Sequence, residues 1–405
     1  MATYKEQNKL NVPHLRFPEF QGEWEKHGLS EYLDFKNGLN PDSKRFGKGI
    51  KFISVMDILN NPVITYDCIR ASVQATDAEI SSFSVENGDI LFQRSSETLE
   101  DVGRANVYID DRVAVFGGFV IRGKKKANYN PLFFRYLLSS PYARKRIIPM
   151  GAGAQHFNIG QEGLSKVLLN FPSIEEQTKI ASLLHLLDER IATQSKLIED
   201  LKKLKSAIID YAINSLDTDF AKFGSLYEMA GEGGTPTTSN ASFYVNGKIP
   251  FVKIDDLKKK YLTENKDFIT ELGLQKSSAW LVPTRSILFS NGATIGEITI
   301  TTYPVCTKQG ILGIVPKPNI DVEFLYYFMS SSYFKKAVSR IVTEGTMKTV
   351  YLKDINNIRC PIPTKEKQLD IAKMPSALNS KIDFEQSILK LFGSQKQYLL
   401  RQMFM

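Results

Sequence analysis

The stretch SIEEQTKIASLLHLLDERIATQSKLIEDLKKLKSAIIDYAI, residues 173–213, predicts one long helix. Pro172 precedes it, and the spacing Ser173-x-x-Glu176 is typical of a capping box, in which side chains bond two backbone amides at a helix start. Apolar residues recur with the heptad spacing of a coiled coil. They are Ile180, Leu183, Leu187, Leu197, Leu201, Leu204, Ile208 and Tyr211, with Leu184, Ile191 and Ile198 widening the stripe. Such a helix, about 60 Å long at 1.5 Å per residue, needs a partner to cover its stripe.

A related stretch, residues 364–404, supplies a candidate partner. When the sequence is shifted by 191 positions, Gln177 falls on Gln368. The apolar residues of the second stretch are Ile371, Met374, Leu378, Ile382, Ile388, Phe392 and Leu399. Pro375 lies inside this pattern, so we expect a kink or a late helix start there. We interpret the two stretches as an antiparallel intramolecular pair that acts as a rigid spacer. The alternative is two amphipathic helices that pack separately on their own domains.

The sequences before the two helices also repeat, which fixes the expected organisation. The matching segments are GIKFISVMDI at 49–58 with KIPFVKIDDL at 248–257, DILF at 89–92 with SILF at 286–289, and FFRYLLSS at 133–140 with FLYYFMSS at 324–331. Strand-like runs and one amphipathic helix occur in the same order in each half. We therefore predict an α+β fold, a tandem repeat of two mixed α/β domains that are each followed by a long helix. The predicted segments are the domains 1–170 and 217–360 and the helical spacers 171–216 and 361–405.

The composition limits the class of protein. The chain has a formal charge of +8 and a pI near 9.0, which favours a polyanionic partner. Cys68, Cys306 and Cys360 are widely separated, which predicts neither a disulfide framework nor a zinc site. No run approaches the length of a membrane span, and the first residues lack an apolar signal core. We expect a cytoplasmic protein in a reducing compartment.

Motifs for catalysis are incomplete. GFVIRGKK at 118–125 approaches a phosphate-binding loop, but Lys125 stands where the magnesium-binding Ser or Thr belongs. NPLF at 130–133 resembles part of the catalytic loop of amino-methyltransferases, yet Pro131 is better explained as the first residue of a helix. A weak match to a metal-dependent nuclease core is formed by Asp256, Glu264 and Lys266. The four histidines have no ligand spacing, so we expect no catalytic residue and no metal in this chain.

Polar loops follow the predicted strands in both halves. Arg, Lys, Gln and Asn can bond base edges in the major groove, and Ser and Thr suit phosphate oxygens. The recurrence of these loops favours DNA contact; the alternative is that they are ordinary solvated loops. The candidate DNA-binding residues of the first half are Lys44, Arg45, Lys48, Gln93, Arg94, Ser95, Arg104, Gln155, His156 and Asn158. Those of the second half are Thr237, Asn240, Asn291, Thr294, Lys308, Gln309, Thr346 and Lys348. Two basic helix faces, at 144–146 and 335–340, are expected to neutralise the DNA backbone.

Several short motifs occur in a fixed order along the chain. They are LRFPEF at 15–20, GEW at 22–24, GTP at 234–236, FVKIDDL at 251–257, ILFSNGATIG at 287–296, TKQG at 307–310, FLYY at 324–327 and Pro361-x-Pro363. This set resembles the specificity subunit of type I restriction-modification systems, and the resemblance covers nearly the whole chain. Three departures are Lys367 in place of an acidic capping partner, the varied lead-in KDIN at 353–356 before the second helix, and Pro375 inside that helix.

The resemblance implies a non-catalytic DNA reader. Each domain would read one half of a split, asymmetric sequence, and the helices would fix the gap and dock two modification (methyltransferase) subunits. Restriction (translocase and nuclease) subunits would complete the complex, with no membrane partner. S-adenosylmethionine would belong to the modification subunits, and ATP and Mg²⁺ to the restriction subunits, so no cofactor is expected in this chain. The residues expected at the helix–helix and subunit interface are Ile180, Leu184, Leu187, Ile191, Ile198, Leu201, Ile371, Leu378, Ile382, Phe392 and Leu399.

Two other functions stay open at this point. A free-standing DNA-binding regulator could use the same loops, but it would need no apolar surplus beside the helix seam. An enzyme built on the incomplete motifs would lose its activity when Lys124 or Glu264 is changed.

Overall fold

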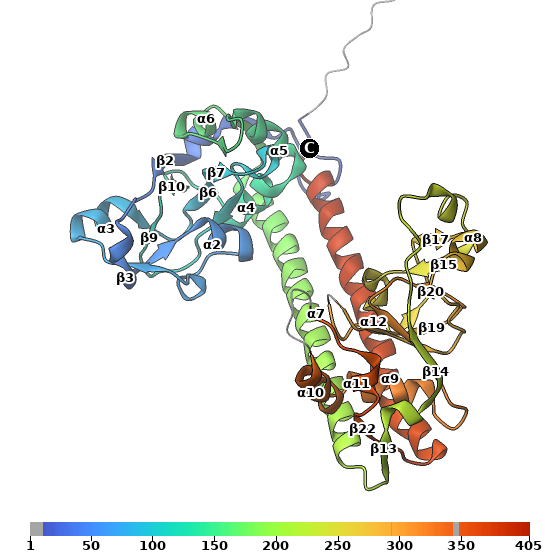
Figure 1. The fold of residues 1–405 in the computed structure, drawn as a ribbon. Helices are drawn as coiled ribbons and strands as arrows, with labels where there is room; N and C mark the ends of the chain where they lie inside the picture. Colours follow the sequence, from blue (N-terminus) through green and yellow to red (C-terminus); the bar gives the residue numbers. More distant parts are fainter. Residues whose placement is uncertain (1–10, 293, 343–347) are drawn as a thin grey trace, which may run out of the picture. The chain divides into compact units, whose positions relative to one another are not determined.

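The computed structural model describes residues 11–292, 294–342 and 348–405. The chain forms two compact units (Figure 1). Unit 1 contains the residues up to Ser195 together with Ile388–Met405, and unit 2 contains Lys196–Ser387. Each unit holds one mixed α/β domain and a part of both long helices. The boundaries between the two compact units fall inside the two long helices. The predicted division of the chain into separate domains and helical spacers therefore stays a prediction.

The domain of unit 1 is built on two four-stranded sheets. The first has the order β2 (Leu33–Asn37), β10 (Val120–Lys125), β6 (Ile90–Gln93) and β8 (Ala105–Val107), all antiparallel. The second has the order β4 (Ser72–Val73), β3 (Phe46–Ile53), β9 (Ala114–Phe116) and β5 (Ser84–Val85), with β3 and β9 parallel. Two further pairs are β1 (Glu25–Gly28) with β12 (Leu168–Phe171) and β7 (Ser95–Ser96) with β11 (Phe157–Asn158). The helices are α1 (Leu29–Tyr32), α2 (Val55–Asn60), α3 (Asp77–Phe83), α4 (Pro131–Ser139), α5 (Pro141–Ile147) and α6 (Gln161–Ser165).

The domain of unit 2 repeats this plan. Its larger sheet has the order β14 (Tyr227–Glu232), β21 (Ile311–Pro316), β18 (Ile287–Ser290), β19 (Ile298–Thr301) and β16 (Tyr261–Leu262). A smaller sheet contains β17 (Asp267–Ile269), β15 (Ile249–Val252) and β20 (Cys306–Thr307), and β13 (Phe220–Lys222) pairs with β22 (Arg359–Pro361). The helices are α8 (Glu271–Gln275), α9 (Val322–Ser330), α10 (Ser332–Ile341) and α11 (Leu352–Ile355). The first four strands of the larger sheet follow the order of the all-antiparallel sheet in unit 1, which confirms the predicted tandem repeat.

Aromatic side chains close the core of unit 1. Tyr129 and Phe134 stack with 4.0 Å between ring centroids. Trp24 meets Phe133 and Phe404 edge to face, at 6.1 and 6.4 Å. Phe404 is fully buried, and burial of such a side chain contributes about 1.5–3 kcal/mol. Residues far apart in the sequence therefore share one hydrophobic core.

Helices α7 (Ile174–Asn214) and α12 (Lys365–Gln402) pair antiparallel in unit 1 (Figure 1). Leu184 of α7 lies in the same buried cluster as Leu399 of α12. One turn further along α7, Asp188 forms an ion pair with Lys396 at 2.5 Å. Burial opposes ionisation of Asp188, but the hydrogen bond and charge of Lys396 prevail and lower the pKa of this carboxyl group.

The same two helices also contact each other in unit 2. Ile209 of α7 is buried in one cluster with Ala372 of α12. Lys205 Nζ donates to Asn379 Oδ1 at 2.9 Å, and burial lowers the pKa of this lysine. Pro375 lies within α12, which begins ten residues earlier at Lys365, so the expected late start is wrong.

The predicted seam was partly wrong about which apolar residues are covered. Leu197, Leu204 and Tyr211 are 41, 49 and 77% exposed, and Met374 of α12 is 61% exposed. Each long helix carries more than one apolar stripe, so spacing alone does not show which stripe faces inward. The predicted interface residues lie inside the covered stripes. Ile180, Leu184, Leu187, Ile198, Ile382 and Leu399 are buried, and Ile191, Leu201, Ile371, Leu378 and Phe392 are half-buried.

A buried glutamine ties each long helix to its domain in the same way. In unit 1, Gln177 Oε1 accepts from Asn130 N at 3.1 Å, and Gln177 Nε2 donates to Pro172 O at 3.0 Å. In unit 2, Gln368 Oε1 accepts from Asp321 N at 2.8 Å, and Gln368 Nε2 donates to Pro363 O at 2.9 Å. Asn130 and Asp321 are the N-caps of α4 and α9, so each glutamine joins two helix starts.

The start of α7 differs from the expected capping box. Ser173 Oγ does accept from Glu176 N at 3.3 Å. The Glu176 carboxylate, however, is buried and accepts from Arg16 Nε at 2.8 Å and Nη2 at 2.7 Å, and from Trp24 Nε1 at 3.3 Å. The reciprocal half of the box is wrong because this carboxylate holds the segment before β1 against the helix.

Candidate nucleic-acid interface

In unit 1, three segments meet where β6 ends. Arg94 N donates to Phe119 O at 2.9 Å, and Arg94 O accepts from Ile159 N at 2.9 Å. Ser95 Oγ donates to Asn158 Oδ1, beside the pairing of β7 with β11. The loop after β6, the turn at Phe119 and the loop that ends at Asn158 therefore form one surface.

Unit 2 builds the same frame with different side chains. Asn291 N donates to Gly310 O at 3.0 Å, and Asn291 O accepts from Val350 N at 2.9 Å. These three residues occupy the positions that Arg94, Phe119 and Ile159 hold in unit 1. The structure thus confirms that the predicted loops of the two halves are equivalent.

Two predicted DNA-binding side chains are buried within these loops. Gln93 is 5% exposed and its Nε2 donates to Ser95 O at 2.9 Å. Asn291 is 1% exposed and its Nδ2 donates to Val350 O at 3.1 Å. Both side chains shape the loop from within, and neither reaches the surface.

Other predicted side chains are exposed on backbone turns. Lys308 N and Gln309 N donate to Val252 O at 2.9 Å and Thr235 Oγ1 at 3.3 Å, so the backbone of their turn is anchored. Asn240 Oδ1 accepts from Ser242 N at 3.1 Å and caps a short helical turn. The exposed members of the predicted set are Lys44, Lys48, Arg104, Gln155, His156, Asn158, Thr237, Asn240, Thr294, Lys308, Gln309 and Lys348. Thr346 lies outside the described residues.

Two predicted arginines form ion pairs within unit 1. Arg45 binds both carboxylate oxygens of Glu79 and donates to Gln74 O at 2.8 Å. The hydrogen bond from Arg45 is the largest cause that lowers the pKa of Glu79 to about 2. Arg104 pairs with Asp101 at 2.6 Å and is exposed. A contact with DNA would compete with these carboxylates.

One basic residue on α5 is placed differently from expectation. Arg144 Nη2 donates to Glu100 O at 2.8 Å and Val102 O at 2.7 Å. Burial lowers the pKa of Arg144 to about 10. The prediction that Arg144 neutralises the DNA backbone is therefore wrong, because its guanidinium supports a loop. Lys145 and Arg146 on the same helix are exposed.

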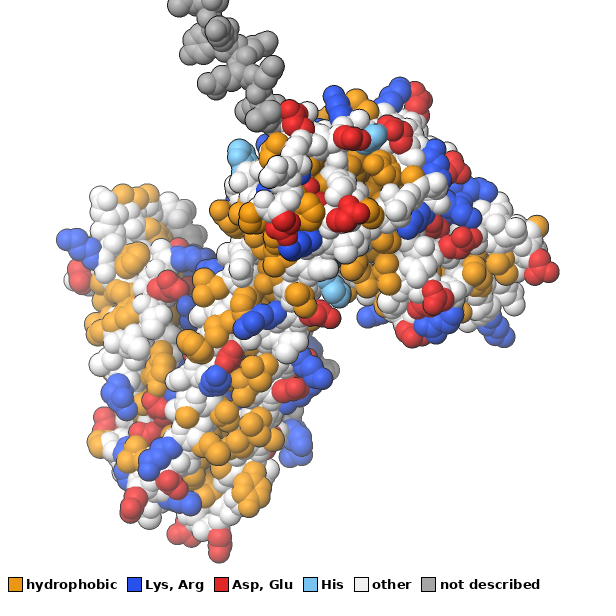
Figure 2. Space-filling view, turned by 180° about the vertical axis from the view of Figure 1, so that it is seen from behind, with side chains coloured by type: hydrophobic (Ala, Val, Ile, Leu, Met, Phe, Trp, Pro, Cys, Tyr) orange, Lys and Arg blue, Asp and Glu red, His pale blue; other side chains and the backbone are white. Residues whose placement is uncertain are grey.

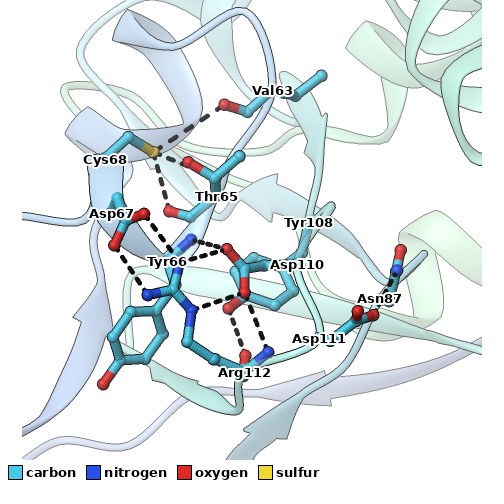
Figure 3. Close-up of polar contacts among 10 residues, drawn as sticks. All are labelled: Val63, Thr65, Tyr66, Asp67, Cys68, Asn87, Tyr108, Asp110, Asp111 and Arg112. Atoms are coloured by element: carbon cyan, nitrogen blue, oxygen red, sulfur yellow. Dashed lines mark hydrogen bonds and ion pairs between the residues drawn. The ribbon is translucent and has the colours of Figure 1, made fainter.

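A second arginine is also committed to internal contacts. Arg112 lies between the carboxylates of Asp67 and Asp110 and beside the ring of Tyr66 (Figure 3). The N–O distances are 2.9 Å to Asp67 and 3.0 Å to Asp110, and the guanidinium lies 4.5 Å from the centroid of the Tyr66 ring. The hydrogen bonds from Arg112 lower the pKa of both aspartates. This cluster holds the turn between β8 and β9, so Arg112 is a structural residue.

The exposed charges of the protein are mixed in sign. Figure 2 shows one face of the molecule, on which Lys and Arg side chains alternate with Asp and Glu and with hydrophobic side chains. The formal net charge of +8 is therefore not gathered into one continuous basic patch on this face. Specific contact would depend on individual loops.

A subset of the exposed apolar residues follows a heptad spacing on each long helix. On α7 they are Leu197, Leu204 and Tyr211, and on α12 they are Leu391 and Tyr398, which are 67 and 57% exposed. Residues seven apart lie on one helix face. Each stripe is separate from the buried one and is exposed.

The described residues contain neither a membrane-spanning helix nor a cluster of metal ligands. Over 11–292, 294–342 and 348–405, no helix has the length and apolar character needed to cross a bilayer. Within the same ranges, His, Cys, Asp and Glu side chains do not gather in threes that could hold a metal ion.

The chain is similar to known specificity subunits over most of its length. A family model described as the type I restriction modification DNA specificity domain matches residues 21–203 and 217–391. The putative type I restriction enzyme MjaX specificity subunit of Methanocaldococcus jannaschii is 24% identical, over 94% of this chain and 92% of that protein. The HindI specificity subunit of Haemophilus influenzae is 22% identical, over 73% and 80%.

A solved structure shares the fold. The type I restriction-modification S subunit from M. genitalium has a TM-score of 0.56 and 16% identity, covering 97% of this chain and 99% of that one. The two family matches together span most of the sequence, and the repeated fold agrees with them. The chain therefore belongs to the family of type I restriction-modification specificity subunits, non-catalytic proteins that carry the DNA specificity of their complexes in two domains.

Proposed function

We propose that each domain reads one half of a bipartite, asymmetric DNA target. The observation that carries this proposal is the equivalence of the loops. Arg94 and Asn291 have the same backbone hydrogen bonds, yet one is a half-buried arginine and the other a buried asparagine. One backbone frame with two sets of side chains suits two different half-sites, because base edges are read by side chains.

The exposed loop residues and the half-buried Arg94 are the proposed contacts with DNA. We assign Lys44, Lys48, Arg94, Gln155, His156, Asn158, Thr237, Asn240, Thr294, Lys308, Gln309 and Lys348 to this interface, in contact with bases or phosphates. Gln93 and Asn291 act as positioning residues, because their amides hold the loops from within. Arg45 and Arg104 would reach phosphates only by leaving their carboxylate partners.

The paired helices are proposed to fix the gap between the half-sites. Insertion of seven residues into each helix, at matched places, would lengthen the pair by about 10 Å. At 3.4 Å per base pair, the unspecified gap of the target should grow by about three base pairs. An unchanged gap with unchanged half-sites would contradict the spacer role.

The exposed stripes on the helices are proposed to dock the modification subunits. Leu204→Ser tests the stripe on α7 and Leu391→Ser tests the stripe on α12. Each variant should reduce co-purification with the modification subunit and leave the thermal unfolding of the chain unchanged, because the mutated side chain is exposed. A matched control is Leu168→Ser, an exposed leucine in β12. Normal assembly of both helix variants would exclude these stripes as the docking surface.

Adenine methylation in a methylation-free host tests the function as a whole. The chain is expressed with the modification subunit from its own locus, and modified adenines are mapped by long-read sequencing. The expected result is a split motif with two defined halves around a fixed gap. Replacement of residues 217–358 by those of a relative should change one half only. A stable complex without methylation at a defined motif would contradict sequence reading, and absence of a complex would favour a free-standing regulator.

A further inference from the structure

The turn between β9 and β10 in unit 1 corresponds to the turn between β20 and β21 in unit 2, but the first is apolar and the second is polar. In unit 2 it carries Lys308-Gln309-Gly310, between β20 and β21. In unit 1 the segment 117–119, between β9 and β10, reads Gly-Gly-Phe. The backbone bonds match, because Gly117 N donates to Ile53 O at 3.0 Å and Lys308 N donates to Val252 O at 2.9 Å. An aromatic side chain therefore stands where unit 2 has a glycine.

The aromatic side chain belongs to a larger exposed apolar surface. Phe119 is 69% exposed, Met56 is 60% exposed and Phe46 is 44% exposed. Together with Phe52 they border a hollow of about 420 Å³, which Ser95 also lines. Clustered, exposed apolar side chains around a hollow are uncommon on a protein surface and mark a contact site.

The hollow is a built feature of unit 1. A Cβ atom on Gly118 would lie 1.8 Å from Asn40 Oδ1, and one on Gly117 would lie 2.7 Å from the Phe52 ring. A side chain at Gly118 would have to displace the Asn40 amide, and one at Gly117 would have to displace the Phe52 ring. The two glycines thus permit the close approach that leaves Phe119 at the rim.

The methionine at the rim has a charged counterpart in unit 2. Ser54 N donates to Asp57 Oδ2 at 2.7 Å, and Lys253 N donates to Asp256 Oδ2 at 2.9 Å, which makes these turns equivalent. The position of Met56 is then held by Asp255, whose side chain is 89% exposed. The rim residues Phe119 and Met56 of unit 1 are thus replaced in unit 2 by Gly310 and Asp255.

We propose that this hollow receives the 5-methyl group of a thymine in the half-site read by unit 1. The proposal rests on the proposed function, because the hollow adjoins the predicted reading loop. Arg94 N donates to Phe119 O, and Arg94 Nη1 donates to Gly118 O at 3.2 Å. Among the base edges in the major groove, only thymine presents a methyl group, and an apolar side chain such as Phe is a recognised partner for it. Unit 2 reads its half-site through polar groups at the same place.

Deoxyuridine tests this contact, because it lacks only the methyl group of thymine. Once the motif is known, synthetic duplexes carry deoxyuridine for each thymine of one half-site, and the affinity of the full complex is measured. Replacement in the half-site of unit 1 should weaken binding about three- to tenfold, as expected for the loss of a buried methyl contact. The same replacement in the other half-site should have no effect on affinity.

Variants at the rim complete the test. Phe119→Ala should weaken binding to the thymine duplex by a similar factor and should bind the thymine and deoxyuridine duplexes equally. Phe119→Leu should retain most of the discrimination. Val113→Ala, at an exposed apolar residue that does not line the hollow, is the control. All these side chains are at least 42% exposed, so equal melting temperatures are expected.

The outcomes separate this proposal from the proposed function. Specific binding that ignores deoxyuridine, or a unit 1 half-site without any A·T pair, would overturn the methyl contact and leave sequence reading intact. Phe119→Ala could also weaken binding to both duplexes and leave the ratio of the affinities for the thymine and deoxyuridine duplexes as in the unmodified protein. Phe119 would then act as a wedge between bases, and the proposal would be wrong. Absence of specific binding to every duplex would contradict the proposed function itself.

Discussion

Replacement of Gln368 by alanine should loosen the attachment of α12 to the domain of unit 2. The side chain is 1% exposed and makes three hydrogen bonds. It accepts from Asp321 N at 2.8 Å and donates to Pro363 O at 2.9 Å and Asn319 O at 3.2 Å. Gln368→Ala removes all three partners at once and leaves a buried amide with no acceptor.

The magnitude follows from the groups that are left unpaired. Each buried polar group without a partner costs about 1–3 kcal/mol. The amide of Asp321 should carry the full penalty, whereas the two carbonyl oxygens have second lone pairs and should cost less. We therefore expect Gln368→Ala to lower the free energy of unfolding of unit 2 by about 2–5 kcal/mol, a large part of the usual 5–15 kcal/mol. Gln177→Ala should affect unit 1 somewhat less, because two hydrogen bonds are lost there.

Hydrogen exchange of the full chain, followed by mass spectrometry, measures this effect in each unit separately. In Gln368→Ala, peptides that cover α9 should exchange at least about 30-fold faster, which corresponds to 2 kcal/mol. Peptides of α4 should keep their protection. The control is Gln386→Ala, an exposed glutamine on the same helix, which should stay within about 0.5 kcal/mol of the unmodified chain. If Gln368→Ala behaved like Gln386→Ala, the buried glutamine would not hold the helix to the domain.

Three further effects are expected. Arg16→Ala leaves the buried Glu176 carboxylate unpaired, so unit 1 should lose about 3–5 kcal/mol of stability in denaturant titration, and a loss below 1 kcal/mol would contradict this reading. The pKa of Asp188 is lowered in the folded chain, so the stability that it contributes with Lys396 is present above its unfolded pKa and is lost as the pH falls below about 4. Melting temperatures of the unmodified chain and Asp188→Asn should therefore differ at pH 7 and converge in acid; a constant difference would refute the assignment. Lys348→Ala should either weaken binding to all DNA sequences and reduce the salt slope by about 1, or relax one position of one half-site, and unchanged affinity and motif would exclude the contact.

The repeat could be predicted because it is visible without knowledge of contacts. Pro131 at the first position of α4 and the shifted match of Gln177 with Gln368 both depend on local sequence, and the structure confirms them. The choice between the stripes of α7 could not be made in this way. Leu197 and Ile198 are adjacent and both apolar, yet the first is exposed and the second is buried. Only packing against α12 and the domains decides between them.

The sequence predicted the candidate site only in part, for a similar reason. The sequence predicts DNA contacts for Arg45 and Arg144 and a capping box for Glu176, but each side chain binds a partner that is distant in sequence. A sequence pattern cannot show that a charge is already paired. Phe119 was missed because its neighbourhood, GFVIRGKK at 118–125, was interpreted only as an incomplete phosphate-binding loop. The comparison of Phe119 with Gly310 across the repeat is the signal that could have found it.

The shared core of unit 1 has a consequence for the order of events during synthesis. Trp24 and Phe133 emerge early from the ribosome, but Phe404, which packs against both, is made after the whole of unit 2. At about 5–20 residues per second, the roughly 270 residues between Phe133 and Phe404 delay this contact by about 14–54 s. During that interval the apolar surface that later receives Phe404 is open to chaperones, and nascent chains interrupted anywhere in unit 2 would keep it open.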